Sequence, residues 1–118
     1  PREVNGNTMS DCIFCKIVAG ELPAKVVYEN DQLLAFPTIE PKADTHLLVI
    51  PKKHTENLNT LTADDADMIA HLMTTLPKIA ASAGLTGYRT ITNTGAEGGQ
   101  EVFHMHFHIL GGDQLPGF

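Results

Sequence analysis

Three histidines stand at alternate positions near the end of the chain, as His104, His106 and His108. Apolar residues separate and follow them, and a glycine pair, Gly111-Gly112, ends the run. Because successive side chains of a β-strand point to opposite faces, this alternation predicts a strand over 104–112 whose three imidazoles share one face. Three apolar side chains are then expected on the other face, in a core: Met105, Phe107 and Ile109.

An imidazole can act near neutral pH as a nucleophile, as a general acid or base, or as a metal ligand. Three of them on one strand face therefore predict a catalytic site or a metal site, since two histidines on one face can chelate a metal ion. A histidine-rich surface strand is a third interpretation. The regular apolar residues between the histidines argue against that one.

A second group able to do chemistry is the pair Cys12 and Cys15. On a helical turn, residues three apart face the same way. Such a pair can be a redox pair, half of a zinc site, or two small core residues. The chain has 2 cysteines, so a second Cys-x-x-Cys is absent and the further ligands of a zinc ion would have to be histidines. A disulfide framework is not indicated.

A glycine-containing turn leads into the histidine strand, with Gly99, Gln100 and Glu101 as its last residues. Glycine is the usual residue where the backbone must approach an anion closely, and successive backbone N–H groups can hold a phosphate. The turn therefore predicts a phosphate-binding segment next to the histidines.

The rest of the sequence predicts an α+β fold in which helices pack on an antiparallel sheet. A short helix is expected from Ser10 or Asp11 to Gly20, and a long one from the N-cap Thr62 to Gly84. Pro77 is expected to kink the long helix or to divide it. Apolar patterns and turn residues predict the strands, at 25–29, 32–36, 45–50, 88–94 and 104–112.

Length and composition are those of an ordinary globular domain. The 118 residues contain 42% hydrophobic and 19% charged residues, and we expect one domain over 9–118. Residues 1–8 are polar and precede Met9, so a disordered arm or an expression remnant is expected there. The net charge of -6 argues against a general nucleic-acid binder. No apolar run approaches a membrane span or a secretory segment, and a cytoplasmic protein is expected.

The motif His104-x-His106-x-His108 followed by apolar residues resembles the signature of the histidine-triad (HIT) proteins, which are nucleotide hydrolases and transferases. The Gly111-Gly112 ending and the lead-in over 98–102 are similar to the Hint branch, the nucleoside phosphoramidases. The resemblance runs from about Asp11 to Gly112. It implies a five-stranded antiparallel sheet with one long and one short helix, and a homodimer joined sheet edge to sheet edge.

The resemblance also implies catalytic roles. His106 would be the nucleophile that attacks the α-phosphorus and forms a nucleotidyl-imidazole, and His108 would donate to the phosphoryl oxygens. His46, on a neighbouring strand, would orient the triad. Glu101 stands where much of the Hint branch has serine. A carboxylic acid there can protonate an amine leaving group, whereas an ionised one would repel phosphate.

A nucleotide-binding set follows from the same resemblance. Asn93 is implied to contact the ribose or phosphate, and Thr38 stands where the family usually has an aspartate that binds both ribose hydroxyls. A threonine offers one hydroxyl and no charge. The purine pocket is implied at six apolar positions that, taken alone, also suit a core: Ile13, Phe14, Ile17, Phe36, Ile39 and Leu48.

Some family members and a related uridylyltransferase use a cysteine pair of this kind for zinc. A histidine after the Pro-Lys-Lys segment and the first triad histidine complete their ligand sets. The resemblance thus implies a structural zinc held by Cys12, Cys15, His54 and His104. Two thiolates and two imidazoles leave no open position on tetrahedral zinc, so no catalytic cofactor is expected.

The leading hypothesis is a Hint-like hydrolase that cleaves the phosphorus–nitrogen bond of purine nucleoside phosphoramidates and releases a nucleoside monophosphate. One alternative is a dinucleoside polyphosphate hydrolase. Another is a nucleotide-binding regulatory protein with little turnover, which Thr38 favours, and a third is a metalloenzyme that uses the three histidines. The expected partners are a purine nucleotide or phosphoramidate and a second copy of the chain, with no nucleic acid and no membrane.

Overall fold

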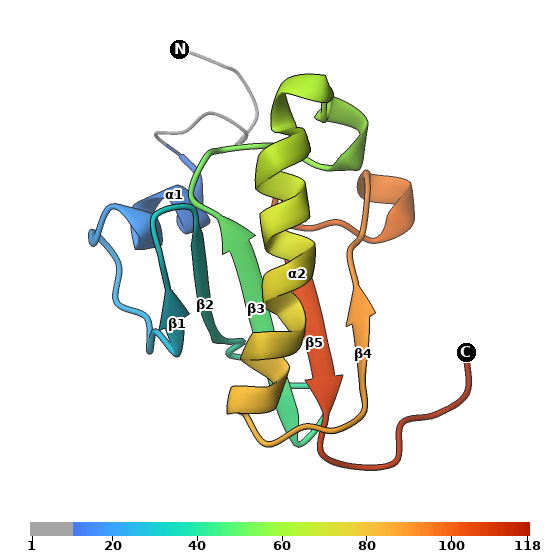
Figure 1. The fold of residues 1–118 in the computed structure, drawn as a ribbon. Coiled ribbons are helices and arrows are strands. Elements are labelled where there is room, and N and C mark those ends of the chain that lie inside the picture. The colour runs from blue at the N-terminus through green and yellow to red at the C-terminus, as the bar shows by residue number, and fades with distance from the viewer. Residues whose placement is uncertain (1–10) are drawn as a thin grey trace.

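The central layer of the fold is a five-stranded antiparallel sheet (Figure 1). The structure is a computed structural model and describes residues 11–118. The predicted arm at 1–8 lies outside the described residues, as do Met9 and Ser10. The sheet order is β1-β2-β3-β5-β4, and every neighbouring pair is antiparallel. The strands are β1 (Tyr28–Glu29), β2 (Leu33–Pro37), β3 (Thr45–Pro51), β4 (Tyr88–Ile91) and β5 (Phe107–Gly111). The predicted α+β fold is confirmed.

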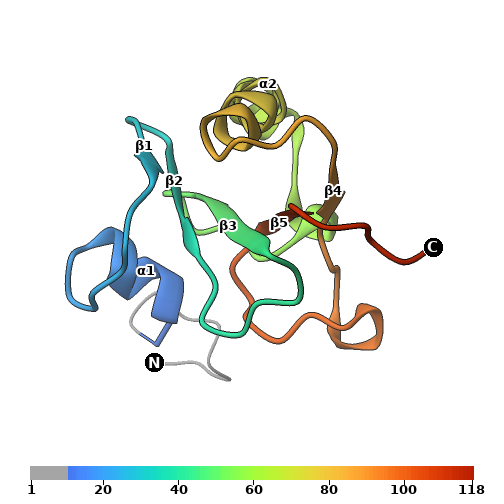
Figure 2. The ribbon, with the colours of Figure 1, turned by 90° about the horizontal axis from the view of Figure 1, so that it is seen from below.

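The two α-helices lie on opposite faces of this sheet (Figure 2). The long helix α2 (Ala66–Ser82) covers one face, and the short helix α1 (Ile13–Val18) lies on the other. Three single 3-10 turns complete the elements of residues 11–118, at Leu58–Thr60, Ala63–Asp65 and Ala96–Gly98. No helix in this part of the chain is long and apolar enough to cross a lipid bilayer.

Strand alternation produces two separate apolar clusters, one on each face. The cluster under α2 contains Met105, Phe107 and Ile109 of the predicted histidine strand, as expected. The cluster on the α1 side contains Phe36 and Leu48. His108 stands between Phe107 and Ile109 in β5 (Phe107–Gly111) and therefore points to the α1 side, because side chains of successive strand residues point to opposite faces.

Strand β5 begins at Phe107, not at His104 as predicted. The β3–β5 register pairs Val49 with Phe107, and its continuation would set Met105 opposite Pro51. A proline has no N–H for the ladder. The Met105 N–H instead donates to the Thr55 carbonyl at 2.6 Å, so the first two histidines precede the strand in an irregular segment.

Both edge strands are also shorter than predicted. In the predicted strand at 25–29, the Val26 N–H turns back to the Ala24 carbonyl at 3.1 Å, and β1 keeps two residues. In the predicted strand at 88–94, the Thr92 hydroxyl donates to the His106 carbonyl at 2.8 Å. The Thr92 hydroxyl thus takes the place of a main-chain hydrogen bond between the strands, and β4 ends at Ile91.

The long helix is one piece, so the predicted division at Pro77 is wrong. Thr62 caps the 3-10 turn that runs directly into α2, and Gly84 ends the helix with a φ of 82°. Proline removes the N–H that would bond the carbonyl of Met73, four residues earlier. Pro77 and Met73 both lie on the exposed side, where water can bond that carbonyl.

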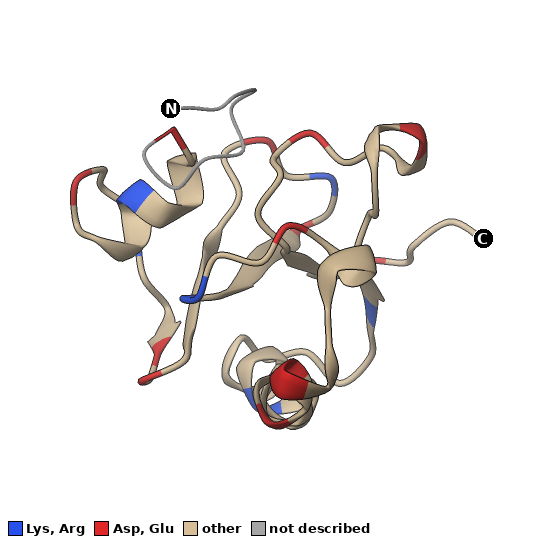
Figure 3. Ribbon diagram, turned by 90° about the horizontal axis from the view of Figure 1, so that it is seen from above, with Lys and Arg blue, Asp and Glu red and all other residues tan. Residues whose placement is uncertain are grey.

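Charged residues are spread over the described chain. Figure 3 places the lysines and arginines on separate elements, not along one helix or strand. Lys52 pairs with Glu29 and Lys53 with Asp65, each at 2.7 Å, so both lysine charges are matched by a carboxylate. Attraction of a large polyanion would require a continuous basic face.

Candidate active site

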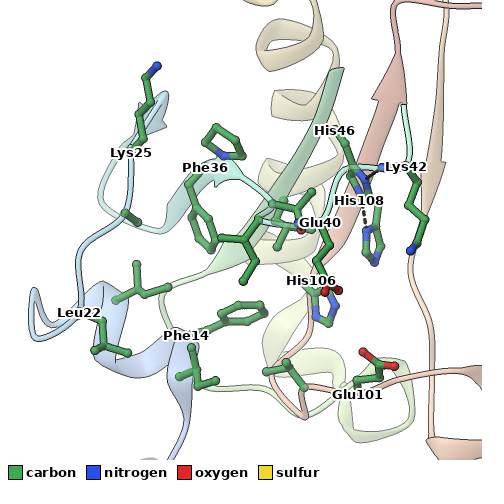
Figure 4. A pocket seen from close by; sticks show the side chains of 18 of the residues that line it. Phe14, Leu22, Lys25, Phe36, Glu40, Lys42, His46, Glu101, His106 and His108 are labelled. Atoms are coloured by element: carbon green, nitrogen blue, oxygen red, sulfur yellow. Dashed lines mark hydrogen bonds between the residues drawn. The ribbon is translucent and has the colours of Figure 1, made fainter. Parts of the chain in front are cut away.

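A cavity of about 1110 Å³ opens on the α1 side of the sheet (Figure 4). Its walls come from α1, from the β2–β3 loop, and from the loop that leads to β5. Most residues predicted to be catalytic or nucleotide-binding line it: Ile13, Phe14, Ile17, Phe36, Thr38, Ile39, His46, Leu48, Asn93, Gly99, Glu101, His106 and His108. The structure thus brings together residues from four distant parts of the sequence.

Gln100 is the predicted site residue that the structure does not bring to the cavity. Its side chain is buried and fully bonded, to its own loop and to the segment after β3. The amide oxygen accepts from Asn57 Nδ2 at 3.0 Å and from the Gly95 N–H at 2.8 Å. The amide nitrogen donates to the carbonyls of Glu56 and Val102, at 2.7 and 3.0 Å. Gln100 holds the loop in shape and has no side-chain group left for a ligand.

Two backbone N–H groups of the predicted phosphate-binding turn are already bonded within the turn. The Gly99 N–H donates to the Ala96 carbonyl and the Gln100 N–H to the Gly95 carbonyl, both at 3.1 Å. Gly99 has a φ of 94°, which favours glycine, so its role is to close this turn. These two N–H groups are therefore not available to an anion in the structure.

His106 presents one free ring nitrogen. Its Nδ1 lies 2.8 Å from the carbonyl oxygen of His104. A carbonyl oxygen only accepts hydrogen bonds, so Nδ1 carries the proton and Nε2 keeps a lone pair. Burial lowers the pKa of this imidazole, with the His104 carbonyl acting in the opposite direction. The ring is therefore neutral. It packs edge-on against Phe14, with 5.1 Å between the ring centres.

His46 and His108 form a hydrogen-bonded pair whose proton positions are also determined by the main chain. The Lys42 N–H donates to His46 Nδ1 at 3.0 Å, which makes His46 Nε2 the protonated nitrogen. That nitrogen donates to His108 Nδ1 at 2.8 Å. The neutral His108 ring therefore carries its proton on Nε2. Its ring centre lies 5.1 Å from that of His106.

Burial favours the neutral form of both rings in this pair. It lowers the pKa of His108 to about 4, with smaller effects from the neighbouring His106 and His46. It also lowers the pKa of His46, and the positive charge of Lys42 acts in the same direction. The cavity thus holds a neutral imidazole with a lone pair beside a neutral imidazole with an N–H donor. That combination suits attack on an electrophile that develops negative charge.

Several cavity residues were not predicted from the sequence. They lie after α1, at the end of β2 and in the β2–β3 loop, and before β5, where no periodic pattern marks a site residue. The charged ones among them are Lys25, Glu40 and Lys42, and the others are Leu22, Pro23, Ala24, Pro37 and Val102. The one available indication is that 37–42 stands between two apolar strands, where loops that carry functional residues are common.

The predicted metal ligands also come together. One ligand atom from each of Cys12, Cys15, His54 and His104 lies within 4.8 Å of all the others. Cys15 Sγ lies 3.2 Å from His54 Nδ1 and 3.5 Å from His104 Nδ1. Cys12 Sγ lies 3.3 Å from His104 Nδ1. Among residues 11–118, these four side chains form the group whose ligand atoms lie close enough together to hold one metal ion.

The donor set fits a four-coordinate metal ion. His104 Nε2 donates to the Pro51 carbonyl at 2.8 Å, which leaves the Nδ1 lone pair facing the sulfur atoms. A carbonyl partner of this kind is the usual support of a ligating imidazole. Burial, together with the nearby Cys12, raises the pKa of the Cys15 thiol to about 12. Binding a divalent cation would therefore release thiol protons.

The metal cluster and the cavity share structural elements. The Phe14 ring, which lines the cavity, also packs edge-on against His104 at 5.8 Å between ring centres. Cys12 caps α1 and Cys15 lies within it, so the cluster joins this helix to the segment that precedes β5. The carbonyl that orients His106 belongs to His104, a member of the cluster.

Comparison with protein families gives one match, to the HIT domain over residues 19–115. An uncharacterized HIT-like protein of Synechococcus elongatus is 51% identical over 106 residues, which cover 89% of this chain and 93% of that protein. The protein HitA of Neisseria gonorrhoeae is 47% identical over 104 residues, 87% of this chain and 97% of that protein.

Solved structures of similar proteins have the same fold. A HIT family hydrolase from Legionella pneumophila is 48% identical, with a TM-score of 0.86 over 89% of this chain and 96% of that chain. A histidine triad protein from Clostridium difficile is 47% identical, with a TM-score of 0.87 over 92% of this chain and 96% of that chain. Identity at this level extends well beyond a shared fold.

Proposed function

This chain belongs to the HIT domain family, and from that premise we propose that it is a hydrolase which cleaves the phosphorus–nitrogen bond of purine nucleoside phosphoramidates. The observation that carries the proposal is the unbonded Nε2 of His106 in a cavity with His108 beside it. The HIT family hydrolase among the similar structures supports hydrolysis as the reaction class.

In the first step, His106 Nε2 attacks the α-phosphorus and a phosphorus–nitrogen bond to the imidazole forms. The bond to the leaving amine breaks, and its electron pair goes to the amine nitrogen, which takes a proton from the carboxylic acid of Glu101. The imidazole becomes positively charged, and its Nδ1–H donates to the His104 carbonyl at 2.8 Å. That carbonyl dipole stabilises the developing charge without reorganisation.

His108 acts on the phosphoryl oxygens. Its Nε2–H is the donor that the hydrogen-bond chain from Lys42 through His46 leaves pointing away from His46. Negative charge grows on those oxygens during attack, so a fixed donor stabilises the transition state more than the substrate. In the second step, water attacks the same phosphorus and gives a proton to the carboxylate of Glu101. The bond to His106 breaks, its electron pair returns to Nε2, and the nucleoside monophosphate leaves.

The apolar wall of the cavity is proposed to hold the purine. Phe14 and Phe36 pack edge-to-face at 5.7 Å between ring centres, and both line the cavity. Ile39 is 96% exposed and therefore has little packing of its own in the free protein. An exposed isoleucine at a cavity rim gains apolar contact when an aromatic ligand binds.

A structural zinc ion bound by Cys12, Cys15, His54 and His104 is part of the proposal. Cys and His donors are those that zinc prefers in closed tetrahedral sites. A bound ion would link α1 to the segment before β5. The residues that touch the substrate would be His106 and His108, outside the ligand set.

We further propose that the protein is a cytoplasmic homodimer joined at a sheet edge. The sheet ends in two edge strands, β1 and β4, and an exposed edge favours pairing with another strand. Both described cysteines are free, as is usual in a reducing compartment.

The test of function is AMP release from an adenosine phosphoramidate, with intact mass measured early in turnover. We expect release by the native protein, together with a population heavier by one adenylyl group, and neither from His106→Ala. His71→Ala is the matched control, because His71 lies on α2 across the sheet and bonds to Asn30. Full activity of His106→Ala would refute the mechanism.

A dinucleoside polyphosphate is the second candidate substrate, because Lys42 lines the cavity beside His46 and can meet additional phosphates. Rates on a diadenosine polyphosphate and on the phosphoramidate, measured side by side, separate the two. If the polyphosphate is cleaved faster, the protein would be assigned as a dinucleoside polyphosphate hydrolase and not as a phosphoramidase. Nucleotide binding without release from either substrate would favour a regulatory binding protein, the alternative that Thr38 supports.

A further inference from the structure

Lys42 is a cation of the cavity wall that has no part in the two proposed reaction steps. Its main-chain N–H donates to His46 Nδ1 at 3.0 Å, so this loop residue is held against the His46–His108 pair. Its side chain lines the cavity. Burial lowers the pKa of His46, and the positive charge of Lys42 acts in the same direction. The ammonium therefore lies close enough to the histidine pair for its charge to act there.

The place of Lys42 relative to the aromatic wall decides which part of a substrate it can meet. Figure 4 shows Phe14 and Phe36 on one side of His106 and the Lys42 side chain on the other, past the His108 ring. With the purine on the phenylalanines and the phosphorus at His106, the ribose lies toward the aromatic wall. The leaving amine is attached to the phosphorus and not to the nucleoside. It therefore extends into the remaining part of the cavity, where Lys42 lies.

The Lys42 ammonium is available for a ligand. The residue is exposed, and within residues 11–118 its ammonium forms neither a hydrogen bond nor an ion pair. Lys52 and Lys53, in contrast, are each paired with a carboxylate. A lysine carries a compact charge on a flexible stem of four carbons, so it can reach anions of different sizes.

The other charges of the cavity make a local cation necessary for an anionic leaving group. The chain has a net charge of -6, and the carboxylates of Glu40 and Glu101 line the same cavity. Like charges repel, so these groups disfavour an anion that has no cation beside it. Lys25 also lines the cavity, but Figure 4 shows it at the opposite end, past Phe36. Of these two lysines, Lys42 is the one at the end where the leaving group would lie.

We propose that Lys42 binds an anionic group on the leaving amine and makes this protein selective for phosphoramidates whose amine carries such a group. The proposal rests on the nucleoside phosphoramidase function and leaves its two reaction steps unchanged. A carboxylate and a phosphate-like group share the chemistry that a lysine recognises, and the test separates these two sources.

The test compares kcat/KM for AMP release from three adenosine phosphoramidates whose amines have similar length. The amines are glycine, which carries a carboxylate, aminomethylphosphonate, which carries a phosphonate, and glycinamide, which is neutral at the same end. The native protein should prefer at least one anionic amine over glycinamide by about fivefold, the upper range for an exposed ion pair. The anion with the larger preference identifies the group that Lys42 binds. The preference should shrink in about 1 M salt, because salt screens exposed charges.

Substitutions of Lys42 test whether this lysine causes the preference. Alanine, glutamate and arginine all keep the main-chain N–H that donates to His46 Nδ1, so the histidine pair retains its proton positions. Lys42→Ala should reduce the preference to about one, and Lys42→Glu should reverse it in favour of glycinamide, because a carboxylate repels the anionic amines. Lys42→Arg, which retains the positive charge, should keep the preference.

Lys25→Ala is the matched control, because it removes a lysine from the opposite end of the same cavity. It should keep the preference for the anionic amine. Retention of the preference in Lys42→Ala, or its loss in Lys25→Ala, would overturn the proposal. Equal kcat/KM of the native protein on all three substrates would also overturn it, while leaving the phosphoramidase function in place.

Absence of AMP release from all three substrates would count against the proposed function, and the anion contact would then be measured as binding. Calorimetry with the same three intact phosphoramidates provides that measurement. Tighter binding of an anionic compound than of the glycinamide compound, lost in Lys42→Ala, would support the contact even without turnover. Equal affinities, or no binding of any of the three, would overturn it.

Discussion

At the scale of single residues, the main chain determines which nitrogen of each histidine carries a proton. Carbonyl oxygens of Pro51 and His104 bond His104 Nε2 and His106 Nδ1, each at 2.8 Å. These contacts leave one lone pair facing the thiols and one facing the cavity. Neutral imidazole has two tautomers, and a catalytic cluster needs one of them at each position. Here backbone geometry selects it.

His46 provides a direct test of that view, because its Nε2 donates to His108 Nδ1 and thereby determines which nitrogen of His108 carries the proton. We expect His46→Ala to lower kcat by about ten- to a hundredfold, the usual loss when a supporting partner of an active-site histidine is removed, and to leave KM nearly unchanged. His46→Gln keeps a side-chain N–H donor and should recover part of kcat. Steady-state kinetics on adenosine phosphoramidate give both values. An unchanged kcat in His46→Ala would show that His108 needs no partner.

The buried histidine pair should make stability depend on pH. Burial lowers the pKa of folded His108 to about 4, whereas the unfolded side chain titrates near 6.5. Between these values the unfolded state binds more protons, so the free energy of unfolding falls as pH falls from about 6.5 to about 4. His46 acts with the same sign.

Thermal unfolding at neutral pH and near pH 4.5 checks this expectation. The Tm of the native protein should fall on acidification by more than that of His108→Asn, which has no imidazole at this position. Comparing the two proteins at each pH cancels proton uptake by the other groups, including the metal ligands. Equal losses of Tm would mean that His108 does not contribute.

At the scale of elements, the short helix α1 depends on its surroundings. It has six residues, far fewer than a helix needs to be stable alone. The helix and its N-cap residue nevertheless contribute two proposed metal ligands, Cys15 and Cys12, and the helix contributes the cavity residue Phe14. We infer that the Cys/His cluster determines the position of the helix, and that the helix in turn positions one wall of the cavity.

Removing the metal should therefore affect both stability and binding. Chelation, or the variant Cys15→Ser, should lower Tm by about 5 °C or more, the shift expected for a loss of roughly 1 to 2 kcal/mol in a domain of this size. Nucleotide affinity should fall as well, because Phe14 lies on α1. Added zinc should restore the chelated native protein but not Cys15→Ser. A Tm that is insensitive to both treatments would refute a structural metal.

Sequence reasoning identified the elements because alternation and helical spacing are local patterns. Its errors arose where contacts distant in sequence decide local structure. Met105 bonds Thr55 in place of a ladder partner, and Gln100 is used up by bonds to Asn57 and Gly95. Nothing near Gln100 in the sequence indicates those partners. Glu40 was not predicted for a related reason, since residues of an irregular loop follow no period.

At the scale of the whole molecule, the two faces of the sheet have separate tasks. The face under α2 is an apolar core that contains Leu72 and Ile79, and the other face carries the cavity and the Cys/His cluster. Strand β5 serves both, because Phe107 and Ile109 pack into the core while His108 faces the cavity. Alternation along one strand thus couples the packing that stabilises the fold to the position of the proposed catalytic group His108.

The open edges of the sheet lead to an expectation about assembly. β4 has four residues against two in β1, so its edge offers the longer row of strand groups to a second copy. Symmetric pairing of β4 with β4 would give a continuous ten-stranded sheet and bring the same residues of two copies together. Light scattering should then give twice the 12.8 kDa of one chain.

Thr90, an exposed residue of β4, allows this edge to be tested. In a symmetric pair, Thr90→Lys places like charges close together across the interface and should give a monomer, because lysines on an edge strand oppose pairing. Thr90→Val, which keeps the shape and suits a strand, should remain dimeric. A monomeric native protein would refute the dimer. A Thr90→Lys protein that stays dimeric would move the interface away from β4, to β1 or to a surface outside the sheet edge.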